Sequence, residues 1–413
     1  MTDFPADFLW GSATAAHQVE GGNTANDWWD WEHTAGSTAT ESSGDAIDHW
    51  NRYDADFALL AALCQNAHRL SLEWSRIEPA EGEFSRVALD HYRRVLGRLA
   101  DHGLTAVTTL HHFTLPRWFA RRGGWLAPDA VEVFERYVAR VADTLGDVVP
   151  WFCTINEPQV VANNGYHTGD FPPGHHDFDE ARRVNEVLVR AHRTAVGALR
   201  AGRGAPKAGT CLQVSVFEPL RPDDPEDVAA VDALRGLVVD THLDDLAGGG
   251  DVGDFVGLQY YTRTVVDASA PGWGGPVREG AETTQMGWEV YPEGFGRVLR
   301  RVAQAGLPIL VTENGIATAD DRQRVRFLAA HLEALAAAVR DGVDVRGYLY
   351  WSAFDNFEWA WGYGPTFGLV GVDREDDFRR VVRPSAVAFG EVARSGSLAP
   401  LRARAAALAD AAE

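Results

Sequence analysis

Cysteine, methionine and lysine are scarce in this chain of 413 residues. It contains three Cys and two Met, and its single lysine is Lys207. The cysteines, Cys64, Cys153 and Cys211, are odd in number and lack the Cys-x-x-Cys spacing of zinc and redox sites. We therefore expect reduced thiols that pack as small apolar side chains, with neither a disulfide framework nor a metal site.

Positive charge is also in short supply. The 38 Lys and Arg residues face 59 Asp and Glu residues, which gives a net charge of −21 at neutral pH. Nucleic acids and anionic membranes bind basic surfaces, so neither is an expected partner. The charge favours solubility and does not identify a substrate.

Long apolar runs are missing as well. No stretch approaches the roughly 20 consecutive apolar residues that a membrane-spanning helix needs. Residues 1–12 contain no basic segment followed by an apolar one, the pattern of a secretory signal. We expect a cytoplasmic protein that does not act on a membrane.

What the chain does have is a regular alternation of short β-rich runs with longer amphipathic segments. The runs typical of strands are Phe8–Ala15, Ala67–Trp74, Thr105–His112, Trp151–Asn156, Ala208–Phe217, Asp254–Tyr261, Pro308–Thr312 and Arg346–Phe354. The amphipathic segments lie near residues 53–64, 86–102, 129–145, 178–202, 226–246, 293–306, 320–341 and 384–394.

Alternation of this kind predicts a parallel sheet, because each helix carries the chain back to start the next strand. Eight such units without an interrupting linker predict a single (β/α)8 barrel, a TIM barrel of the α/β class, over residues 1–395. An open, doubly wound sheet with an insertion is the alternative. Residues 396–413 form an Ala-rich C-terminal tail, either a short helix or a frayed end.

Two short motifs place a glutamate where a predicted strand meets a loop. They are Thr154-Ile155-Asn156-Glu157-Pro158 and Thr312-Glu313-Asn314-Gly315. A carboxylate at such a position is costly to desolvate unless it has a partner, which favours a functional explanation over two ordinary surface acids. In a barrel both would face the mouth formed by the C-terminal strand ends. Two carboxyl groups are what glycosidic bond cleavage requires.

Further polar and aromatic residues occur at the same level of the predicted strands. They are Gln18, Glu20, Arg69, Glu73, His111, His112, Gln259, Tyr261, Trp351, Glu358 and Trp359. Neighbours in a strand point to opposite sides, so one of the two histidines is expected to face inward and the other outward. That arrangement suits a single sugar ligand better than a metal pair.

These residues resemble the signatures of family 1 glycoside hydrolases, the β-glucosidase and β-galactosidase family. The resemblance covers about residues 4–392. It rests on the segment from Phe4 to Gly21, the two glutamate motifs and Asp355-Asn356-Phe357-Glu358-Trp359. It implies a retaining exo-β-glycosidase without a cofactor or metal, whose two carboxyl groups lie roughly 5–5.5 Å apart.

The resemblance also implies roles for individual residues. Glu313 corresponds to the nucleophile and Glu157 to the general acid/base. Catalytic support falls to Arg69, Asn156 and Tyr261, with Asn156 also contacting the sugar 2-hydroxyl. The remaining sugar-binding residues implied are Gln18, His112, Trp351, Glu358 and Trp359.

The expected substrate is a neutral β-glycoside or oligosaccharide. The carboxylate of Glu358 would repel a 6-phosphate, the group that the phosphoglycosidase branches of the family accept. β-Glucosides come first, with β-galactosides or β-fucosides as co-substrates. A transglycosidase that uses the same intermediate and a non-catalytic sugar-binding barrel remain the alternatives. The oligomeric state stays open, a homo-oligomer included.

Several positions depart from the family pattern. Gln213 and Gln259 replace the usual Asn, His17 replaces Tyr, Phe113 replaces Trp and Thr366 replaces Arg. The segment between Gln213 and Gln259 is shorter than is usual and lacks its tryptophan-bearing stretch. The cluster Trp28, Trp29 and Trp31 has two interpretations, aglycone contact or core packing. These departures leave the catalytic pair intact and bear on glycone preference, aglycone subsites and oligomeric contacts.

Overall fold

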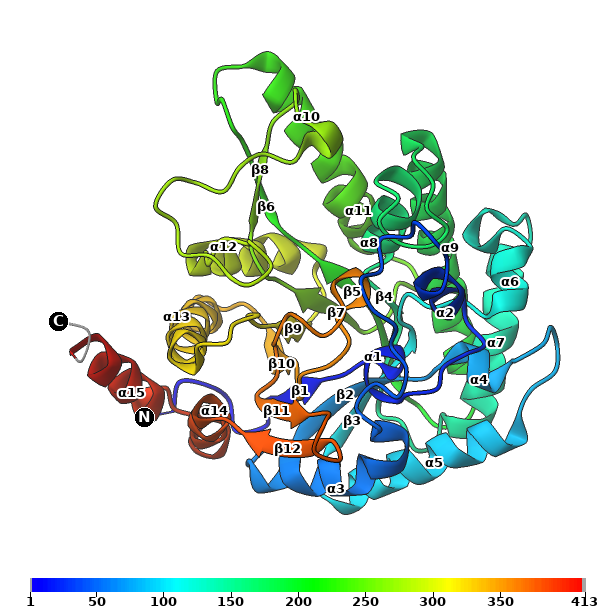
Figure 1. Cartoon of the computed structure of the whole chain (residues 1–413), viewed down its shortest axis with the longest axis horizontal. Coiled ribbons are helices and arrows are strands. Elements are labelled where there is room, and N and C mark those ends of the chain that lie inside the picture. The colour runs from blue at the N-terminus through cyan, green and yellow to red at the C-terminus, as the bar shows by residue number, and fades with distance from the viewer. Residues whose placement is uncertain (1, 411–413) are drawn as a thin grey trace.

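The computed structural model describes residues 2–410 and contains a closed barrel of eight parallel strands (Figure 1). Their order around the barrel is β1-β10-β9-β7-β5-β4-β3-β2. Their bounds are β1 Leu9–Ala13, β2 Ala67–Ser71, β3 Thr105–His111, β4 Trp151–Asn156, β5 Lys207–Gln213, β7 Phe255–Gln259, β9 Ile309–Asn314 and β10 Val345–Trp351. Closure confirms the predicted (β/α)8 barrel and excludes the open doubly wound sheet.

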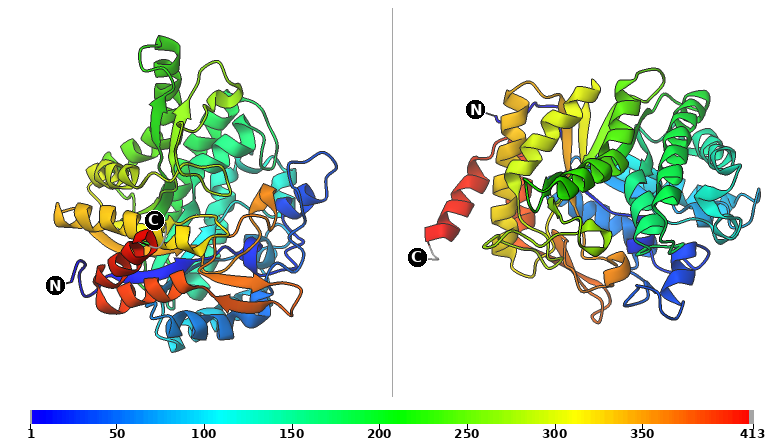
Figure 2. Two further views of the ribbon diagram at one scale, coloured as in Figure 1. Left: turned by 60° about the vertical axis from the view of Figure 1, so that its left-hand side comes forward. Right: turned by 90° about the horizontal axis from the view of Figure 1, so that it is seen from above.

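Helices surround the barrel on its outside (Figure 2). The longer ones follow the strands and are α3 His49–Ala62, α5 Arg86–Asp101, α7 Ala130–Leu145, α9 Phe178–Ala201, α10 Pro225–Arg235, α12 Pro292–Val302, α13 Asp321–Arg340, α14 Pro384–Ser395 and α15 Ala399–Asp410. Helix α13 shows why the pattern predicts them. Its Val325, Leu328, Leu332 and Leu335 are buried at helical spacing against the sheet.

Shorter helical turns connect these elements, mostly on the side of the strand C-termini. The α-helical ones are α1 Ala16–Val19, α2 Asp27–Glu32, α4 Trp74–Ile77, α6 Arg117–Arg121, α8 Pro158–Ala162 and α11 Thr241–Ala247. The 3₁₀ and π turns are η1 Gly124–Leu126, η2 Asn163–His167, η3 Gly236–Asp240, η4 Pro271–Trp273, η5 Ala303–Ala305 and η6 Trp359–Trp361. The predicted helix 226–246 is therefore three pieces, α10, the π turn η3 and α11.

Four short strands outside the barrel were not predicted. β6 (Val216–Pro219) and β8 (Arg263–Val266) form a parallel pair, so the predicted strand Ala208–Phe217 is two strands. β11 (Val370–Asp373) and β12 (Arg379–Val382) form an antiparallel pair. Each has four residues and only partial burial, so no alternating pattern is long enough to indicate it.

The core has an outer layer between strands and helices and a small layer inside the barrel. The inner layer consists of one buried residue from each of seven strands: Ala67, Val107, Cys153, Cys211, Phe255, Leu310 and Leu349. These side chains fill the barrel interior below the strand C-termini, so the barrel has a packed floor. Cys153 and Cys211 are fully buried thiols that pack as small apolar side chains, as predicted, whereas Cys64 is only partly buried.

The Ala-rich segment after α14 is helical in its described part. Helix α15 packs against α13 and α14, and Leu398 and Leu401 are buried at that contact. Residues 411–413 lie outside the described part of the chain. Among the described helices, none combines the length and the apolar character required to cross a bilayer.

Candidate active site

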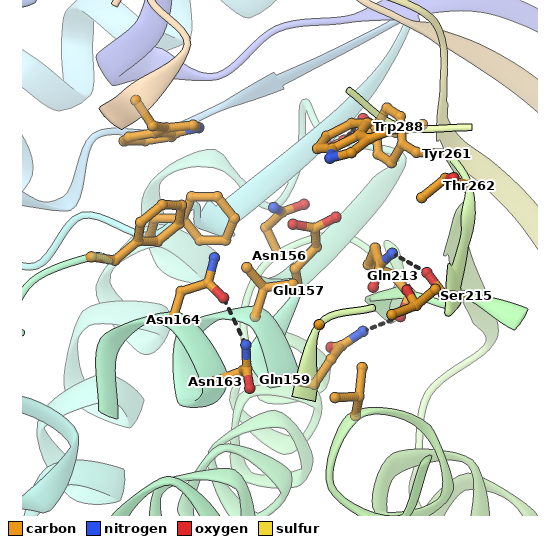
Figure 3. Close-up of a pocket in the computed structure, with 18 of the residues that line it drawn as sticks. Asn156, Glu157, Gln159, Asn163, Asn164, Gln213, Ser215, Tyr261, Thr262 and Trp288 are labelled. Atoms are coloured by element: carbon orange, nitrogen blue, oxygen red, sulfur yellow. Dashed lines mark hydrogen bonds between the residues drawn. The ribbon is translucent and has the colours of Figure 1, made fainter. Parts of the chain in front are cut away.

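The C-terminal ends of the barrel strands open into a cavity of about 320 Å³ (Figure 3). Glu157, which directly follows β4, and Glu313, near the end of β9, both line it. The sequence predicted this meeting of two distant motifs. Other predicted site residues in the cavity wall are His112, Asn156, Tyr261, Trp351, Glu358 and Trp359.

Strand irregularities turn the key side chains inward. Side chains alternate along a strand, so the inward-facing Cys153 and Leu310 would leave Asn156 and Glu313 facing outward. From Cys153 to Asn156, β4 advances three residues while β5 advances two. From Val311 to Glu313, β9 advances two residues while β7 advances one. Each extra residue reverses the alternation, which brings both polar side chains into the cavity.

Three donors hold the carboxylate of Glu313. The guanidinium of Arg69 donates to Oε1, and the side-chain amide of Gln259 donates to the same oxygen over 2.7 Å. The hydroxyl of Tyr261 donates to Oε2 over 2.5 Å. Burial raises the pKa of Glu313, and the charge of Arg69 and the Tyr261 hydrogen bond oppose that rise. The donors therefore favour an ionised carboxylate.

Glu157 has a different environment. Within residues 2–410 no side chain donates a hydrogen bond to its carboxyl group, which lies at the centre of the residues drawn in Figure 3. Burial raises the pKa of Glu157 well above its ordinary value, and the negative charge of Glu313 raises it further. Both causes act in the same direction, so the environment of Glu157 favours its protonated form.

Backbone geometry fixes both glutamates. Glu157 has φ 45° and ψ 57°, a left-handed conformation that costs a non-glycine residue about 1–2 kcal/mol. Position 315, two residues after Glu313, must be glycine because the backbone of Trp351 passes close to it. A Cβ there would lie 1.7 Å from the carbonyl oxygen of Trp351. The Glu-Asn-Gly motif thus combines a functional side chain with a packing requirement.

Asn156 contacts two of the residues that bind Glu313 and also lines the cavity. Its Oδ1 accepts hydrogen bonds from Arg69 over 2.5 Å and from Gln259 over 2.8 Å. Its Nδ2 lies 3.3 Å from Nε2 of His112. With the oxygen engaged, the amide is oriented so that its nitrogen is the group available for a ligand.

One of the two histidines faces inward and the other outward, as predicted: His112 lines the cavity and His111 packs in the outer core. The His112 ring is nearly parallel to those of Trp351 and Trp359, with centroids 6.1 and 6.0 Å away. His111 packs edge-on against Trp125 in the outer core. Burial and the charge of Arg69 keep the pKa of His112 well below its ordinary value, so this ring is neutral at pH 7.

Glu358 and Gln18 form the far side of this site. The Gln18 side-chain nitrogen lies 3.4 Å from the Glu358 carboxyl and also donates to the carbonyl of Phe357 over 2.8 Å. Gln18 is fully buried behind the cavity wall, and its Oε1 has no hydrogen-bond partner within the described residues. Burial, followed by the charge of Glu313, raises the pKa of Glu358 to about 8.

The two glutamine replacements have different outcomes. Gln259 contacts both Asn156 and Glu313, as described above, so its extra methylene brings one amide between two acceptors. Gln213 lines the cavity, but its amide donates to the hydroxyl of Ser215 over 2.8 Å. Gln259 is therefore one of the residues that hold Glu313 in place. The sequence motif did not indicate this contact.

Two of the other departures, Phe113 and His17, lie beside Trp359, whereas Thr366 bonds to Gln285 and to the carbonyl of Thr318. Phe113 lines the cavity and packs against Trp359 with ring centroids 5.1 Å apart. His17 lies behind the same indole, nearly parallel to it, and forms a 2.7 Å contact with Glu32. Trp28 is buried against Trp359, which answers the question of its role in favour of core packing.

The cavity has two chemically different halves. We call the first the strand-end half; its principal residues are His112, Asn156, Glu157, Tyr261, Glu313, Trp351, Glu358 and Trp359. The second, the α10 half, is formed by residues from segments outside the barrel: Phe217, Leu234, Val238 and Trp273. No sequence pattern indicates the α10 half, because scattered apolar residues are equally typical of a core. Among the described residues, no group of His, Cys, Asp and Glu is arranged to hold a metal ion.

Comparisons with known proteins agree with this geometry. Beta-glucosidase A of Thermotoga maritima is 33% identical over an alignment of 441 positions, gaps included. The alignment covers 96% of this chain and 98% of that protein. The bifunctional beta-D-glucosidase/beta-D-fucosidase of Bifidobacterium breve is 34% identical and covers 91% of this chain and 95% of its own length. A solved beta-glycosidase structure from Pyrococcus horikoshii superposes with a TM-score of 0.90 at 37% identity, over 98% and 99% of the two chains.

The family model of glycosyl hydrolase family 1 matches two overlapping stretches, residues 1–251 and 238–397. Together they include both glutamate motifs and every barrel strand. The match, the relatives and the paired carboxyls at the strand ends lead to one conclusion. This chain is a member of glycosyl hydrolase family 1.

Proposed function

We propose that this enzyme is a retaining exo-β-glycosidase that hydrolyses neutral β-glycosides, with Glu313 as nucleophile and Glu157 as general acid/base. One observation carries the proposal. The carboxyls of Glu157 and Glu313 share one cavity, and of these two only Glu313 accepts hydrogen bonds from side chains of the described residues. Retaining glycosidases need this asymmetry, because one carboxyl must attack as an anion while the other donates a proton.

In the first step Glu313 attacks the anomeric carbon of the sugar. The bond between that carbon and the glycosidic oxygen breaks, and Glu157 gives its proton to the departing oxygen. The products are a neutral alcohol and a glycosyl ester on Glu313. We assign to the amide nitrogen of Asn156, which lies 3.3 Å from Nε2 of His112, a hydrogen bond to the 2-hydroxyl of the sugar, a contact that strengthens as the transition state forms.

In the second step the roles reverse. Esterification removes the negative charge of Glu313, and that charge was one of the causes of the raised pKa of Glu157. The pKa of Glu157 therefore falls, and its carboxylate can take a proton from water. The hydroxide attacks the anomeric carbon, the ester bond breaks and Glu313 is released as an anion. Two inversions give net retention.

We assign the sugar-binding role to Gln18, His112, Trp351, Glu358 and Trp359. The indoles and the neutral imidazole offer apolar faces and hydrogen bonds to a pyranose. β-Glucosides are the proposed first substrates, with β-galactosides and β-fucosides as co-substrates. The names of the relatives agree with that range.

The charge of Glu358 alone does not explain why a phosphorylated sugar should be excluded. With a pKa of about 8 in the empty cavity, this carboxyl is mostly protonated at neutral pH. Phosphate selectivity must then come from the surrounding charges. Glu313 is negative, and no described residue lining the cavity is Lys or Arg, so a 6-phosphate would find no cation to pair with.

A cytoplasmic location remains a prediction, supported by the free thiols of Cys153 and Cys211, which suit a reducing compartment. The oligomeric state remains open. A non-catalytic sugar-binding barrel loses support because Glu157 and Glu313 both line the cavity. Transglycosylation would use the same ester and differ only in the acceptor.

Trapping of the ester tests the proposal. The enzyme is incubated with an activated 2-deoxy-2-fluoro-β-glucoside, digested with protease and mapped by mass spectrometry. The fluorine slows both steps and the activated leaving group restores the first, so the ester should accumulate on Glu313. A label on any other residue, or turnover of 4-nitrophenyl β-glucoside with an inverted product, would refute the assignment.

A further inference from the structure

Two neighbouring side chains of α1 contact the segment that carries Glu358 and Trp359. Gln18 donates to the carbonyl of Phe357 over 2.8 Å, and the His17 ring lies edge-on to that of Phe357 with centroids 5.9 Å apart. The same imidazole is nearly parallel to the indole of Trp359, at 5.7 Å and with 10° between the planes. Gln18 has an assigned place in sugar binding. His17 does not line the cavity and has no part in the chemistry described so far.

Trp359 needs neighbours that hold it in place. Its φ is 48°, in the left-handed region that disfavours a bulky side chain. A backbone conformation of this kind persists only where the surrounding contacts enforce it. Besides His17, the indole packs against Trp28 and Phe113, with ring centroids 4.6 and 5.1 Å away. His17 adds what apolar packing lacks, which is a set of directed hydrogen bonds.

The partners of His17 determine which of its ring nitrogens carries the proton. Oδ1 of Asn26, the N-cap of α2, accepts from the backbone N–H of Trp29 over 2.8 Å. The amide nitrogen of Asn26 therefore faces Nδ1 of His17, 2.9 Å away, and Nδ1 must accept. The ring proton then lies on Nε2, which donates to Oε1 of Glu32 over 2.7 Å. A single tautomer thus satisfies both partners.

Glu32 is itself anchored by the segment that follows α2. Its Oε2 accepts from the backbone N–H of Ser43 over 2.8 Å and from the Ser43 hydroxyl over 2.9 Å. The carbonyl of Ser43 accepts from the hydroxyl of Tyr363 over 2.5 Å. Tyr363 comes shortly after η6, the turn that begins at Trp359. The contacts that leave Trp359 through His17 and Glu32 therefore return to its own turn through Ser43 and Tyr363.

The link between His17 and Glu32 is shielded from water. Their side chains are 1% and 0% exposed. Removing one partner would leave the other buried without its hydrogen bond, so the pair fixes the position of the imidazole. Tyrosine, the usual residue at this position of the family, has one polar atom at the tip of its ring. It could not occupy the places of both histidine nitrogens, so this arrangement depends on His17.

We propose that His17 is a positioning residue of the sugar site, which holds Trp359 in the conformation that binds a glycoside. This inference rests on the proposed function, because that function places the sugar against Trp359. Sugar affinity should then depend on the hydrogen bonds of a residue that the sugar does not touch. Binding should respond more than chemistry, because the donors that hold Glu313 come from other strands.

His17→Phe tests the inference, because it keeps a planar ring beside Trp359 and removes both nitrogens. The probe is 1-deoxynojirimycin, which has the hydroxyl pattern of glucose and no aglycone, titrated by calorimetry where circular dichroism shows the variant folded. Its Kd should increase by about tenfold or more. KM for 4-nitrophenyl β-glucoside should increase with it while kcat changes less than about threefold, because the lost contact acts on bound substrate and transition state alike.

Two further variants separate positioning from stability. His17→Gln supplies an acceptor for Asn26 and a donor for Glu32 without the ring, and it should recover part of the lost affinity. His242→Phe is the matched control, since His242 is buried, lies 2.6 Å from Oδ1 of Asn185 and does not line the cavity. It also loses a buried hydrogen bond, so its melting temperature should fall, while Kd and KM stay at the wild-type values.

The outcomes separate the inference from the proposed function. Wild-type Kd and KM in folded His17→Phe would overturn the inference, whatever the melting temperature, because a role in stability alone moves only the latter. An equal increase of Kd in His242→Phe would overturn it as well. If His17→Phe does not fold, Glu32→Gln replaces it, since the amide keeps the shape of the carboxylate but opposes the donors of Ser43; an unchanged Kd there has the same meaning. A wild-type enzyme that neither binds the iminosugar nor acquires a label on Glu313 refutes the proposed function instead.

Discussion

The two halves of the cavity are built from different parts of the chain by different rules. The strand-end half uses residues at the ends of barrel strands, locked by hydrogen bonds such as those around Glu313. The α10 half uses apolar side chains on β6, α10, η3 and η4, which lie outside the barrel (Figure 1). Chemistry that needs oriented charges is thus placed on the rigid sheet, whereas the apolar wall is placed on the connecting segments.

The largest effects should come from the two carboxyls of the strand-end half. Glu313→Ala should reduce kcat for 4-nitrophenyl β-glucoside by about 10⁴-fold or more, because the ester cannot form. Added azide should then attack from the vacated face and give the α-glycosyl azide. Glu157→Ala with an activated substrate should give the β-glycosyl azide instead, since azide replaces water on the existing ester.

Product configuration, measured by NMR, distinguishes these two roles. The same azide anomer from both variants would contradict the division between nucleophile and acid/base. Glu157→Gln adds a graded test. Substrates with poor leaving groups should lose about 10²–10⁴-fold in the first step, while dinitrophenyl glucosides should lose little. An equal loss for every leaving group would argue against the acid role.

A smaller effect is expected at Gln259. Gln259→Asn shortens the side chain by one methylene, so its amide can no longer reach both Asn156 and Glu313. Loss of a hydrogen bond to a charged group corresponds to about 10- to 100-fold in kcat/KM. Gln259→Leu removes both contacts and should be worse. Wild-type kcat/KM in both variants would show that the longer side chain has no positioning role.

Tyr261 controls a pH effect in the same half. Its hydroxyl favours the ionised form of Glu313, so Tyr261→Phe should raise the pKa of that carboxyl. The acidic limb of the pH profile of kcat/KM should move to higher pH, because Glu313 must be ionised to attack. About tenfold of activity should be lost at the optimum. A limb that stays in place or moves to lower pH would contradict this assignment.

The smallest effect should come from a region that belongs to neither half. Removal of residues 396–413 exposes the surface that Leu398 and Leu401 cover, so the melting temperature should fall by roughly 2–6 °C. 4-Nitrophenyl β-glucoside should be cleaved at an unchanged rate. Leu401→Ala should give part of the same loss. An unfolded truncation would show that the barrel domain does not end at residue 395.

The sequence alone was sufficient to predict the architecture and the meeting of the two glutamates in one cavity. Eight alternating units predicted the barrel, and motifs at strand ends predicted that Glu157 and Glu313 meet. These inferences succeed because strand periodicity and strand-end position are local properties of the chain. The short strands β6, β8, β11 and β12 escaped prediction, because four residues carry too little pattern.

Only the tertiary structure decided three further matters. Extra residues in β4 and β9 turn Asn156 and Glu313 inward, and strict alternation would have placed them outside. Burial and the charge of Glu313 raise the pKa of Glu157, whereas Arg69 and Tyr261 oppose the rise that burial causes at Glu313. The α10 half forms where apolar residues of β6, α10 and η3 meet those of η4, and before folding nothing distinguishes them from core residues. The periodicity of apolar residues is a property of the sequence itself, whereas contacts between distant segments form only when the barrel closes.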